Sequence, residues 1–375
     1  MIQSSRRILI TGGAGFIGTH LYEKLLDEGA IVHVFDNLSE QIHGVGAVFT
    51  DPRVEFTQGD VCDLAAISDA VSRADVVYHL AAETGTGQSM YEVRRYVVTN
   101  EVGTATLLEA IANTNRSDIK LIMASSRSVY GEGAYRSLSG DLQQPEARSA
   151  EQLSNGTWDF YDELGGALAP VATPSSFPPN PGSIYAATKY SQEVLCSVFC
   201  RSHGISCTIL RFQNVYGEGQ SLRNPYTGII SIFYNRMRQG LAINIFEDGL
   251  ESRDFVHVSD VIDALISSAC NRVSVSPLVA NVGSGEPMSV LKLAKLLSEV
   301  SGFAARIEVT GDFRVGDVRH CFADIDCARR LIGYSPRVDL RLGLTKFVGW
   351  AIKQPEYQDN SELAMAELAN YGLTN

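Results

Sequence analysis

The first third of the chain alternates short apolar runs with stretches whose apolar residues recur at helical spacing. Near-continuous apolar runs of this length, separated by amphipathic helices, are typical of a parallel sheet covered on both faces. Two later runs continue the pattern, so we expect an α/β fold built on a doubly wound parallel sheet. Strands are predicted over 7–12, 31–36, 54–60, 76–82, 120–126, 206–217 and 277–285, and helices over 16–29, 103–114 and 185–203.

The periodicity collapses between residues 133 and 181, which are dense in Pro, Gly and Ser. A loop of this length in a compact domain is typically functional or disordered. Two interpretations stay open: an ordered excursion at the mouth of an active site, or a solvated insertion without a role. The tail, 356–375, is predicted to hold a short amphipathic helix that packs rather than acts.

Composition narrows the class of protein. The 375 residues are 45% hydrophobic and 20% charged, as in globular proteins. A net charge of −12 without a basic patch argues against nucleic-acid binding. We see no membrane-length apolar segment and no signal-peptide pattern. Seven cysteines without CxxC spacing predict neither disulfides nor a metal site, so Cys196 and Cys200 are expected in the core of a cytoplasmic protein.

The stretch "ITGGAGFIG" places Gly12, Gly15 and Gly18 between an apolar strand and an amphipathic helix. This context predicts a dinucleotide-binding turn of the Rossmann type, with the pyrophosphate at the helix N-terminus. Asp36 ends the second strand, where a carboxylate can accept hydrogen bonds from the ribose hydroxyls. It would repel a 2′-phosphate, and the following "NLSEQ" has no arginine. The predicted cofactor is therefore NAD rather than NADP.

A tyrosine and a lysine, Tyr185 and Lys189, lie four residues apart at the start of a helical stretch. That spacing puts both side chains on one helix face. A free tyrosine, with a pKa near ~10, is a poor base at neutral pH, but a neighbouring ammonium favours the phenolate. The pair could thus move protons, although ordinary surface packing explains it equally well when it is taken alone.

Seven motifs together narrow the interpretation. The chain carries, in order over roughly 7–335, "TGGAGFIG", "DNLS", "HLAA", "SSRSVYG", "YAATK", "RFQNVYG" and "RDFVHVSDV". It resembles the extended short-chain dehydrogenase/reductases, specifically their nucleotide-sugar epimerases and dehydratases. The resemblance implies that Tyr185 is the catalytic base, that Lys189 supports it and that Ser126 is the catalytic serine. It also implies cofactor contacts by Gly12, Gly15, Phe16, Ile17, Gly18, Asp36, Asn37, Asp60, Val61, Leu80, Ala81, Ala82, Asn100, Tyr185, Lys189 and Phe212.

The residues after Ser126 bear on the reaction. The family's 4,6-dehydratases carry an Asp-Glu pair there, whereas this chain has Arg127 and Ser128, which cannot replace carboxylates. Simple dehydrogenation would require the reduced cofactor to leave. The resemblance therefore favours 4-epimerisation through a transient 4-keto sugar, with NAD regenerated in each cycle. An NAD(P)H-dependent 4-ketoreductase and an NAD-binding sensor without catalytic activity remain as alternatives.

The implied substrate is a nucleotide-diphosphate sugar. Arg253 and Arg314 match the family's diphosphate clamp, with Asp317 on the ribose side, although ion pairs with Glu251 or Asp254 could also explain the arginines. The remaining candidates for the substrate pocket are Glu83, Ser89, Arg127, Asn214, Asn224 and Tyr226.

Several features bear on the substrate's identity. "GQSMYE", "NPYTG", "IFEDG" and the 133–181 insertion resemble the dTDP-L-rhamnose 4-epimerases. UDP-glucose or UDP-N-acetylglucosamine epimerisation is the alternative. The resemblance further implies a homodimer that pairs helices near 100–115 and 185–203.

These expectations divide the chain into two domains. We predict an NAD-binding domain over 1–215, which includes the insertion and to which 254–283 returns. A smaller mixed α/β C-terminal domain for the nucleotide sugar is predicted from 216–253 and 284–355.

Overall fold

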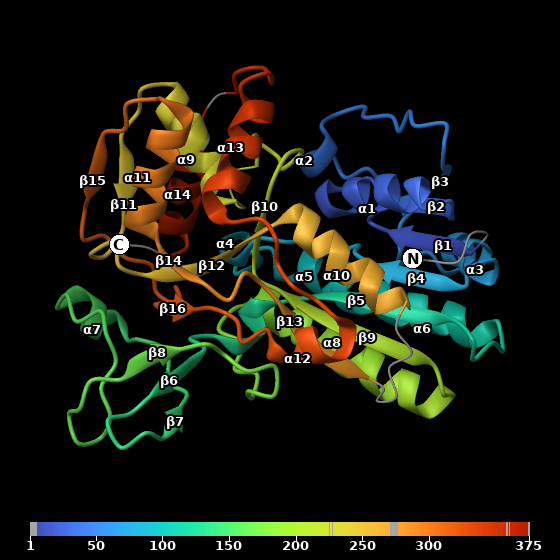
Figure 1. The fold of residues 1–375 in the computed structure, drawn as a ribbon, viewed down its shortest axis with the longest axis horizontal. Helices are drawn as coiled ribbons and strands as arrows, with labels where there is room; N and C mark the ends of the chain where they lie inside the picture. The colour runs from blue at the N-terminus through green and yellow to red at the C-terminus, as the bar shows by residue number, and fades with distance from the viewer. Residues whose placement is uncertain are drawn as a thin grey trace.

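A parallel sheet of seven strands forms the centre of the computed structural model, which describes residues 6–224, 226, 228–270, 277–357, 359 and 361–373 (Figure 1). The strands are β1 (Arg7–Thr11), β2 (Ile31–Asp36), β3 (Glu55–Gln58), β4 (Val76–His79), β5 (Lys120–Ser126), β9 (Ser206–Phe212) and β13 (Leu278–Val282). Their order is β13-β9-β5-β4-β1-β2-β3. The order reverses beside β1, which is where doubly wound sheets bind ligands. The predicted fold class is confirmed.

Helices cover both faces of this sheet, which explains why its strands are apolar throughout. Ile8 and Ile10 of β1 belong to one apolar core, and Leu9 belongs to the core on the opposite face. The first face is covered by α1 (Phe16–Asp27), α10 (Val258–Cys270) and α12 (Asp326–Ile332), and the second by α3 (Leu64–Ser72), α6 (Gly103–Asn113) and α8 (Ile184–His203). The connections hold α2 (Glu40–His43), α4 (Thr86–Ser89), α5 (Val93–Tyr96), the π-helix η1 (Val97–Val102) and the 3₁₀ turn η2 (Arg127–Tyr130).

Four of the seven cysteines are buried. Cys196 and Cys200 of α8 are buried in the core of the second face, as predicted, and all seven cysteines are free thiols. Across the described ranges, no helix combines the length and apolar character that crossing a membrane requires.

The predicted strand over 206–217 is in fact two strands. Gln213 donates its backbone N–H to the carbonyl of Val282 at 2.9 Å, after which the chain leaves the central sheet. It continues as β10 (Asn214–Tyr216), which pairs in parallel with β12 (Ser252–His257). Nothing in the sequence of 206–217 indicated this change of sheet.

A second region follows, with its own core between three helices and short strands. β12 is the central strand of a small mixed sheet. It pairs antiparallel to β14 (Pro287–Ser289) and parallel to β16 (His320–Cys321). The other elements are α9 (Ile229–Arg238), β11 (Ile243–Ile245), α11 (Val290–Ser301), β15 (Ile307–Val309), α13 (Leu340–Ala351) and the tail helix α14 (Ser361–Asn370). The exact domain boundaries stay a prediction.

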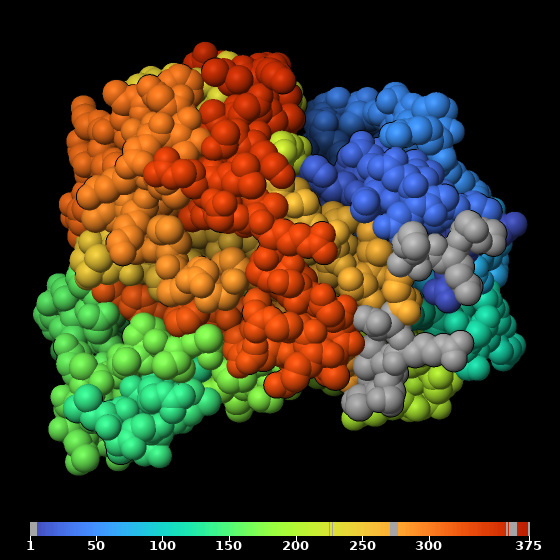
Figure 2. Space-filling model, viewed as in Figure 1, coloured from blue at the N-terminus to red at the C-terminus, as the bar shows by residue number. Residues whose placement is uncertain are grey.

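The 133–181 insertion has secondary structure of its own. A three-stranded antiparallel sheet has the order β7-β6-β8, where the strands are β6 (Ala134–Arg136), β7 (Leu142–Gln143) and β8 (Ala169–Val171). One short helix, α7 (Ala150–Ser154), lies between β7 and β8. In Figure 2 this green segment lies against the orange and red C-terminal segments.

Candidate active site

A cavity of about 480 Å³ opens at the carboxyl ends of the central strands. Its lining includes residues at or just after the ends of five strands: Gly12 after β1, Asp36 on β2, Leu80 after β4, Ser126 on β5 and Phe212 on β9. Open parallel sheets bind their ligands at this edge. The cavity is therefore the candidate active site.

The glycine turn brings the first helix close to the sheet. Gly12 has a φ of +70°, and a Cβ there would lie 2.6 Å from the backbone nitrogen of Ala81. A Cβ on Gly18 would lie 2.5 Å from the Cα of Gly13. Helix α1 starts after Gly15, which contributes no capping side chain to the first N–H groups. These N–H groups and the helix dipole suit a pyrophosphate, so the turn fits a dinucleotide.

Asp36 connects the second strand to this turn. Its carboxylate accepts hydrogen bonds from the backbone N–H of Ala14 at 3.0 Å and of Leu38 at 2.8 Å, and it lines the cavity. The imidazole of His43 lies beside this carboxylate, with its Nε2 3.7 Å from Oδ1. The site thus offers a negative charge to a ribose, which is the arrangement that suits NAD.

Most of the predicted cofactor residues line the cavity, but two do not. Asp60 accepts a hydrogen bond from the N–H of Cys62 at 2.8 Å and stabilises its own turn. Asn100 is fully buried and donates to Thr188 Oγ1 at 2.9 Å, so it links η1 to α8. The predicted cofactor residues in the lining are Gly12, Gly15, Phe16, Ile17, Gly18, Asp36, Asn37, Val61, Leu80, Ala81, Ala82, Tyr185, Lys189 and Phe212.

The three candidate catalytic residues meet at the cavity. Ser126 ends β5, while Tyr185 and Lys189 occupy the first two turns of α8, and all three line the cavity. Two serines fix the start of α8: Ser183 accepts from the N–H of Ala186 at 3.2 Å, and Ser89 accepts from the N–H of Tyr185 at 3.0 Å. Helix capping thus sets the position of the tyrosine.

Burial governs the charges of this group. It raises the pKa of Tyr185, while a hydrogen bond with Ser126 and the positive charge of Arg127 lower it. Burial also lowers the pKa of Lys189 to about 8, against the opposing effect of the Glu193 carboxylate. Lys189 therefore remains mainly an ammonium at neutral pH, and Arg127 is a second cation beside the tyrosine.

Arg127 extends the site toward the substrate side. Its Nε donates to Asn214 Oδ1 at 2.8 Å, and both residues line the cavity. Its Nη1 is buried and has no hydrogen-bond partner among the residues that the structure describes. An unsatisfied buried donor is costly, so this atom is suited to an acceptor on a bound molecule.

Three further substrate candidates, Glu83, Asn224 and Tyr226, line the same cavity. Ser89 does not, which corrects its predicted place in the sugar pocket. Its side chain is fully buried, and its Oγ donates to the carbonyl of Thr86 at 2.6 Å. The hydroxyl holds α4 and α8 together instead.

The predicted diphosphate clamp lies outside the cavity lining. Arg253 donates to the carbonyls of Ser252 at 2.9 Å and Arg319 at 3.1 Å, and its Nη2 lies 3.6 Å from Asp317 Oδ1. Arg314 lies over the ring of Phe246, 4.8 Å from its centroid. This second cluster adjoins the cavity, because Arg253 lies on β12, which also carries the lining residue Phe255.

Some lining residues were not predicted. Residues 84–86 follow the same strand end that drew attention to Glu83, so that signal could have found them. Gln220 and Ser221 shortly precede Asn224. His43 reaches the cavity from α2, and no local pattern marks it.

Comparisons with known proteins agree with this geometry. Residues 9–143 match the family model for GDP-mannose 4,6 dehydratase, and residues 153–283 match that of the NAD dependent epimerase/dehydratase family. A dTDP-L-rhamnose 4-epimerase from Burkholderia thailandensis is 37% identical over 353 residues, which cover 93% of this chain and 96% of the relative.

Solved structures of epimerases have the same fold. The UDP-glucose 4-epimerase of Thermotoga maritima with UDP-glucose has a TM-score of 0.74 at 31% identity, and the UDP-glucuronic acid 4-epimerase of Bacillus cereus with UDP-glucuronic acid and NAD has 0.73 at 28%. Each match covers 92% of this chain and 99% of the other. The predicted resemblance is confirmed: the chain belongs to the NAD dependent epimerase/dehydratase family.

Proposed function

We propose that the chain is an NAD-dependent 4-epimerase of nucleotide-diphosphate sugars. The observation that carries this proposal is that Ser126, Tyr185 and Lys189 line one cavity together with the glycine turn. The positions after Ser126 hold Arg127 and Ser128, which provide no carboxylate for dehydration. Oxidation and reduction at one carbon are the chemistry that these groups support.

In the proposed reaction, NAD bound at the glycine turn would accept a hydride from C4 of the sugar and return it. Tyr185, as phenolate, takes the proton of the C4 hydroxyl, while Ser126 holds the same oxygen by a hydrogen bond. Lys189 and Arg127 stabilise the negative charge on the phenolate. The resulting ketone is planar at C4. Once its opposite face is presented, Tyr185 returns the proton to the oxygen of the inverted alcohol.

The substrate that we favour is dTDP-L-rhamnose, on the strength of the sequence motifs and the similarity to the Burkholderia thailandensis enzyme. UDP-glucose and UDP-N-acetylglucosamine are the alternatives. In each case Arg253 and Arg314 would bind the diphosphate, and Asp317 would contact the ribose. Forked guanidinium donors with permanent charge suit phosphate oxygens.

One observation favours a second candidate, a nucleotide-linked uronic acid. Arg127 lines the cavity and its buried Nη1 has no hydrogen-bond partner among the described residues, so a carboxylate that reached this atom would satisfy the donor. The Bacillus cereus structure holds UDP-glucuronic acid, which makes this the acidic sugar to try. A 6-deoxy sugar would leave Arg127 to bind a hydroxyl or ketone oxygen.

We also propose a homodimer that pairs the α8–η1 patch, which we define as Tyr190, Val194, Val198, Val98 and Val102. These five side chains are exposed on the adjoining elements α8 and η1. Tyr190, Val194 and Val198 recur every four residues, so they share one helix face. An apolar stripe of this kind on two adjacent helices suits packing against a second copy.

The function is tested by incubating the protein and NAD with dTDP-L-rhamnose, UDP-glucose, UDP-N-acetylglucosamine and UDP-glucuronic acid in separate reactions. Proton NMR of the products should show a new isomer of unchanged mass from one donor, with no net NADH. Tyr185→Phe should bind NAD normally and lose turnover by roughly a hundredfold or more, the scale of general acid–base catalysis.

Two other results would each favour a rival. Stoichiometric consumption of NADPH with a 4-keto sugar, and no isomer from any donor, would favour the ketoreductase. Binding of NAD without turnover of any of these compounds would favour the sensor. Wild-type turnover in Tyr185→Phe would contradict the proposed mechanism itself.

A further inference from the structure

The 133–181 insertion sends a buried arginine into the C-terminal region. The side chain of Arg148 is only 1% exposed. Its Nη1 donates to Glu247 Oε2 at 2.8 Å, and its Nη2 donates to the carbonyl of Asp317 at 2.9 Å. Its Nε lies 3.8 Å from Glu132 Oε1. One residue of the insertion thus holds a backbone carbonyl that is 169 positions away in the sequence.

Arg319 contacts Glu247 and Glu132, the same two carboxylates that lie beside Arg148. Its side chain is also 1% exposed, and it donates to Glu247 at 3.0 Å and to both oxygens of Asp248 at 2.7 and 2.8 Å. Its Nε donates to Asp159 of the insertion at 2.9 Å. Its backbone N–H donates to Glu132 Oε2 at 2.7 Å. Arg319, two residues after Asp317, is therefore fixed by the insertion and by Glu132, the residue that immediately precedes the insertion.

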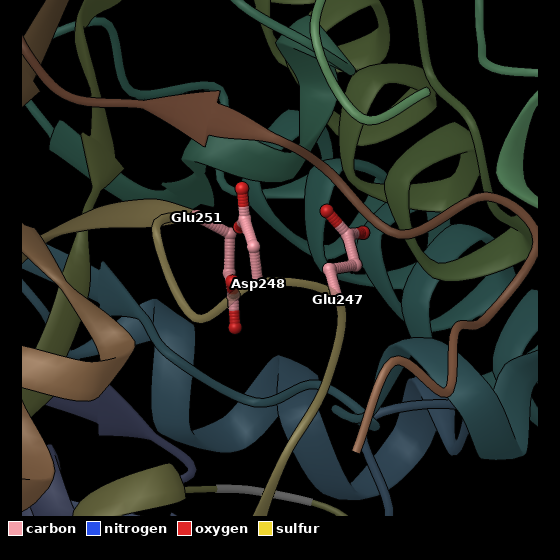
Figure 3. A group of neighbouring side chains, drawn as sticks. All are labelled: Glu247, Asp248 and Glu251. Atoms are coloured by element: carbon pink, nitrogen blue, oxygen red, sulfur yellow. The ribbon is translucent and has the colours of Figure 1, made fainter. Parts of the chain in front are cut away.

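Figure 3 shows the carboxylates at the centre of this network, Glu247, Asp248 and Glu251. They lie close enough together to hold a metal ion. However, the guanidinium groups of Arg148 and Arg319 already bond two of them, and Arg319 Nη1 lies 3.9 Å from Glu251. Buried carboxylates need such partners, so the arginines account for this cluster without an ion.

The segment held in this way adjoins the candidate active site. It runs from Arg314 to His320 and contains Asp317. Arg253 donates to the carbonyl of Arg319 at 3.1 Å, and its Nη2 lies 3.6 Å from Asp317. The position of the Arg253 guanidinium thus depends on the same segment. Arg253 lies on β12, and Phe255 of the same strand lines the cavity.

We propose that the insertion is a brace that positions the 314–320 segment, and with it Arg253, for the nucleotide diphosphate of the substrate. The main positioning residues are Arg148 of the insertion and Glu132, which immediately precedes it, because they bond the backbone of Asp317 and Arg319. This inference rests on the proposed function, since it assigns the bound diphosphate to Arg253 and Arg314. It assigns a role to the insertion, which the sequence alone left open.

Calorimetric titration of the full-length protein with dTDP and with UDP tests the brace. Arg148→Ala should weaken binding of whichever nucleotide the wild type binds by roughly tenfold, the scale of a lost charge-assisted contact. The affinity for NAD should stay unchanged, because Arg148 contacts none of the glycine turn. Arg148→Lys should restore part of the binding. Arg136→Ala is the matched control, since Arg136 is an exposed arginine of the same insertion.

Amide hydrogen exchange gives a readout that does not depend on the ligand. In Arg148→Ala, exchange should accelerate across 314–320 and leave the central sheet unchanged. If Arg148→Ala does not fold, Glu132→Gln, which keeps an acceptor oxygen, and Arg148→Lys serve in its place, with a smaller acceleration at the same segment. Unchanged exchange at 314–320 in the folded variants would overturn the brace.

The two proposals fail in different ways. A wild type that binds neither dTDP nor UDP would overturn the proposed function, and the nucleotide role of the brace with it. If the wild type binds a nucleotide and Arg148→Ala binds it equally well, the brace is overturned and the proposed function is not. If Arg148→Ala and Arg136→Ala lost nucleotide affinity equally, the brace would also be overturned, because the loss would not depend on the buried contacts of Arg148.

Discussion

Tyr185 lies in a pocket whose burial opposes its ionisation. Burial raises the pKa of the phenol, and the nearby groups that counter this are Ser126 and Arg127. The sequence spacing predicts Lys189 as the side-chain cation that favours the phenolate. The lysine is buried at the same cavity, but the structure adds Arg127 as a cation beside the phenol. The residue that departs from the dehydratase pattern thus also contributes to the charge balance of the base.

The pKa of Lys189 gives a pH dependence. Burial lowers it from 10.5 to about 8, so the ammonium predominates below that pH and is lost above it. Because the ammonium favours the phenolate, we expect kcat to fall as the pH rises through about 8. Lys189→Met should have a lower kcat at every pH, and its kcat should not fall as the pH rises through about 8. The same descending limb in Lys189→Met would contradict the assignment.

We expect Asp36 to set the preference for NAD over NADP. We expect Asp36→Asn to raise the affinity for NADP relative to NAD by roughly tenfold, because a negative charge beside the 2′-phosphate is removed. The amide keeps one oxygen to accept from the N–H groups of Ala14 and Leu38, which limits damage to the fold. Fluorescence titration with both cofactors measures the ratio. An unchanged ratio would show that other groups select the cofactor.

The site residues that the sequence could identify are those with a local signature. Gly12, Asp36, Ser126 and Tyr185 each follow or end a strand or start a helix, and all of them line the cavity. Ser89 could not be placed in this way. The partner of its hydroxyl is the N–H of Tyr185, 96 positions away, and only the packing of α4 on α8 brings them together.

At the scale of elements, the tail helix α14 reaches the cavity wall. Glu367 accepts hydrogen bonds from Tyr91, at 3.0 Å, and from Tyr226, which lines the cavity. Leu368 is buried and contacts Gly87 of α4. The tail was expected to pack, and it does, but it packs on residues beside the candidate sugar pocket.

Removal of the tail should therefore affect the substrate more than the cofactor. We expect a chain that ends at Asp359, which keeps the ion pair of Asp359 with Arg236, to show a KM for the nucleotide sugar raised by roughly three- to tenfold, as for the loss of one or two hydrogen bonds. NAD affinity should be unchanged. Steady-state kinetics on the truncated chain and on Glu367→Ala measure this effect. An unchanged KM in both would limit the tail to a structural role.

Hydrophobic patterns did not predict some of the other elements. The strands β6, β7 and β8 have three residues or fewer, which is too short for any periodicity to appear. The split of the 206–217 run into β9 and β10 arises because its second part pairs with β12 of another sheet. Both features depend on partners that are distant in the sequence.

For the whole molecule, the alternation of strands and helices predicted the doubly wound parallel sheet, although the order of the strands came only from the structure. The arrangement of the insertion did not follow. It depends on buried ion pairs between Arg148, Arg319 and acidic residues far along the chain. Charged residues in a Pro- and Gly-rich stretch usually signal solvent exposure, which is why the sequence could not tell a brace from a solvated loop.

Assembly is the prediction at this scale. The wild type should sediment as a dimer, and the double variant Val194→Asp, Val198→Asp should sediment as a monomer, because two carboxylates would enter the apolar centre of the α8–η1 patch. Val309→Asp, at an exposed valine of β15, is the matched control and should remain dimeric. Sedimentation equilibrium distinguishes the two. A dimeric double variant would place the interface elsewhere.

The most direct test of the central claim is to run the epimerisation in D₂O with the best donor and examine C4 of the product by proton NMR. Oxidation and reduction at C4 move that hydrogen as hydride, which does not exchange with solvent, whereas abstraction of a proton from carbon would exchange it. The account predicts a product that is inverted at C4 and retains protium there. Deuterium at C4, or inversion at another carbon, would contradict it.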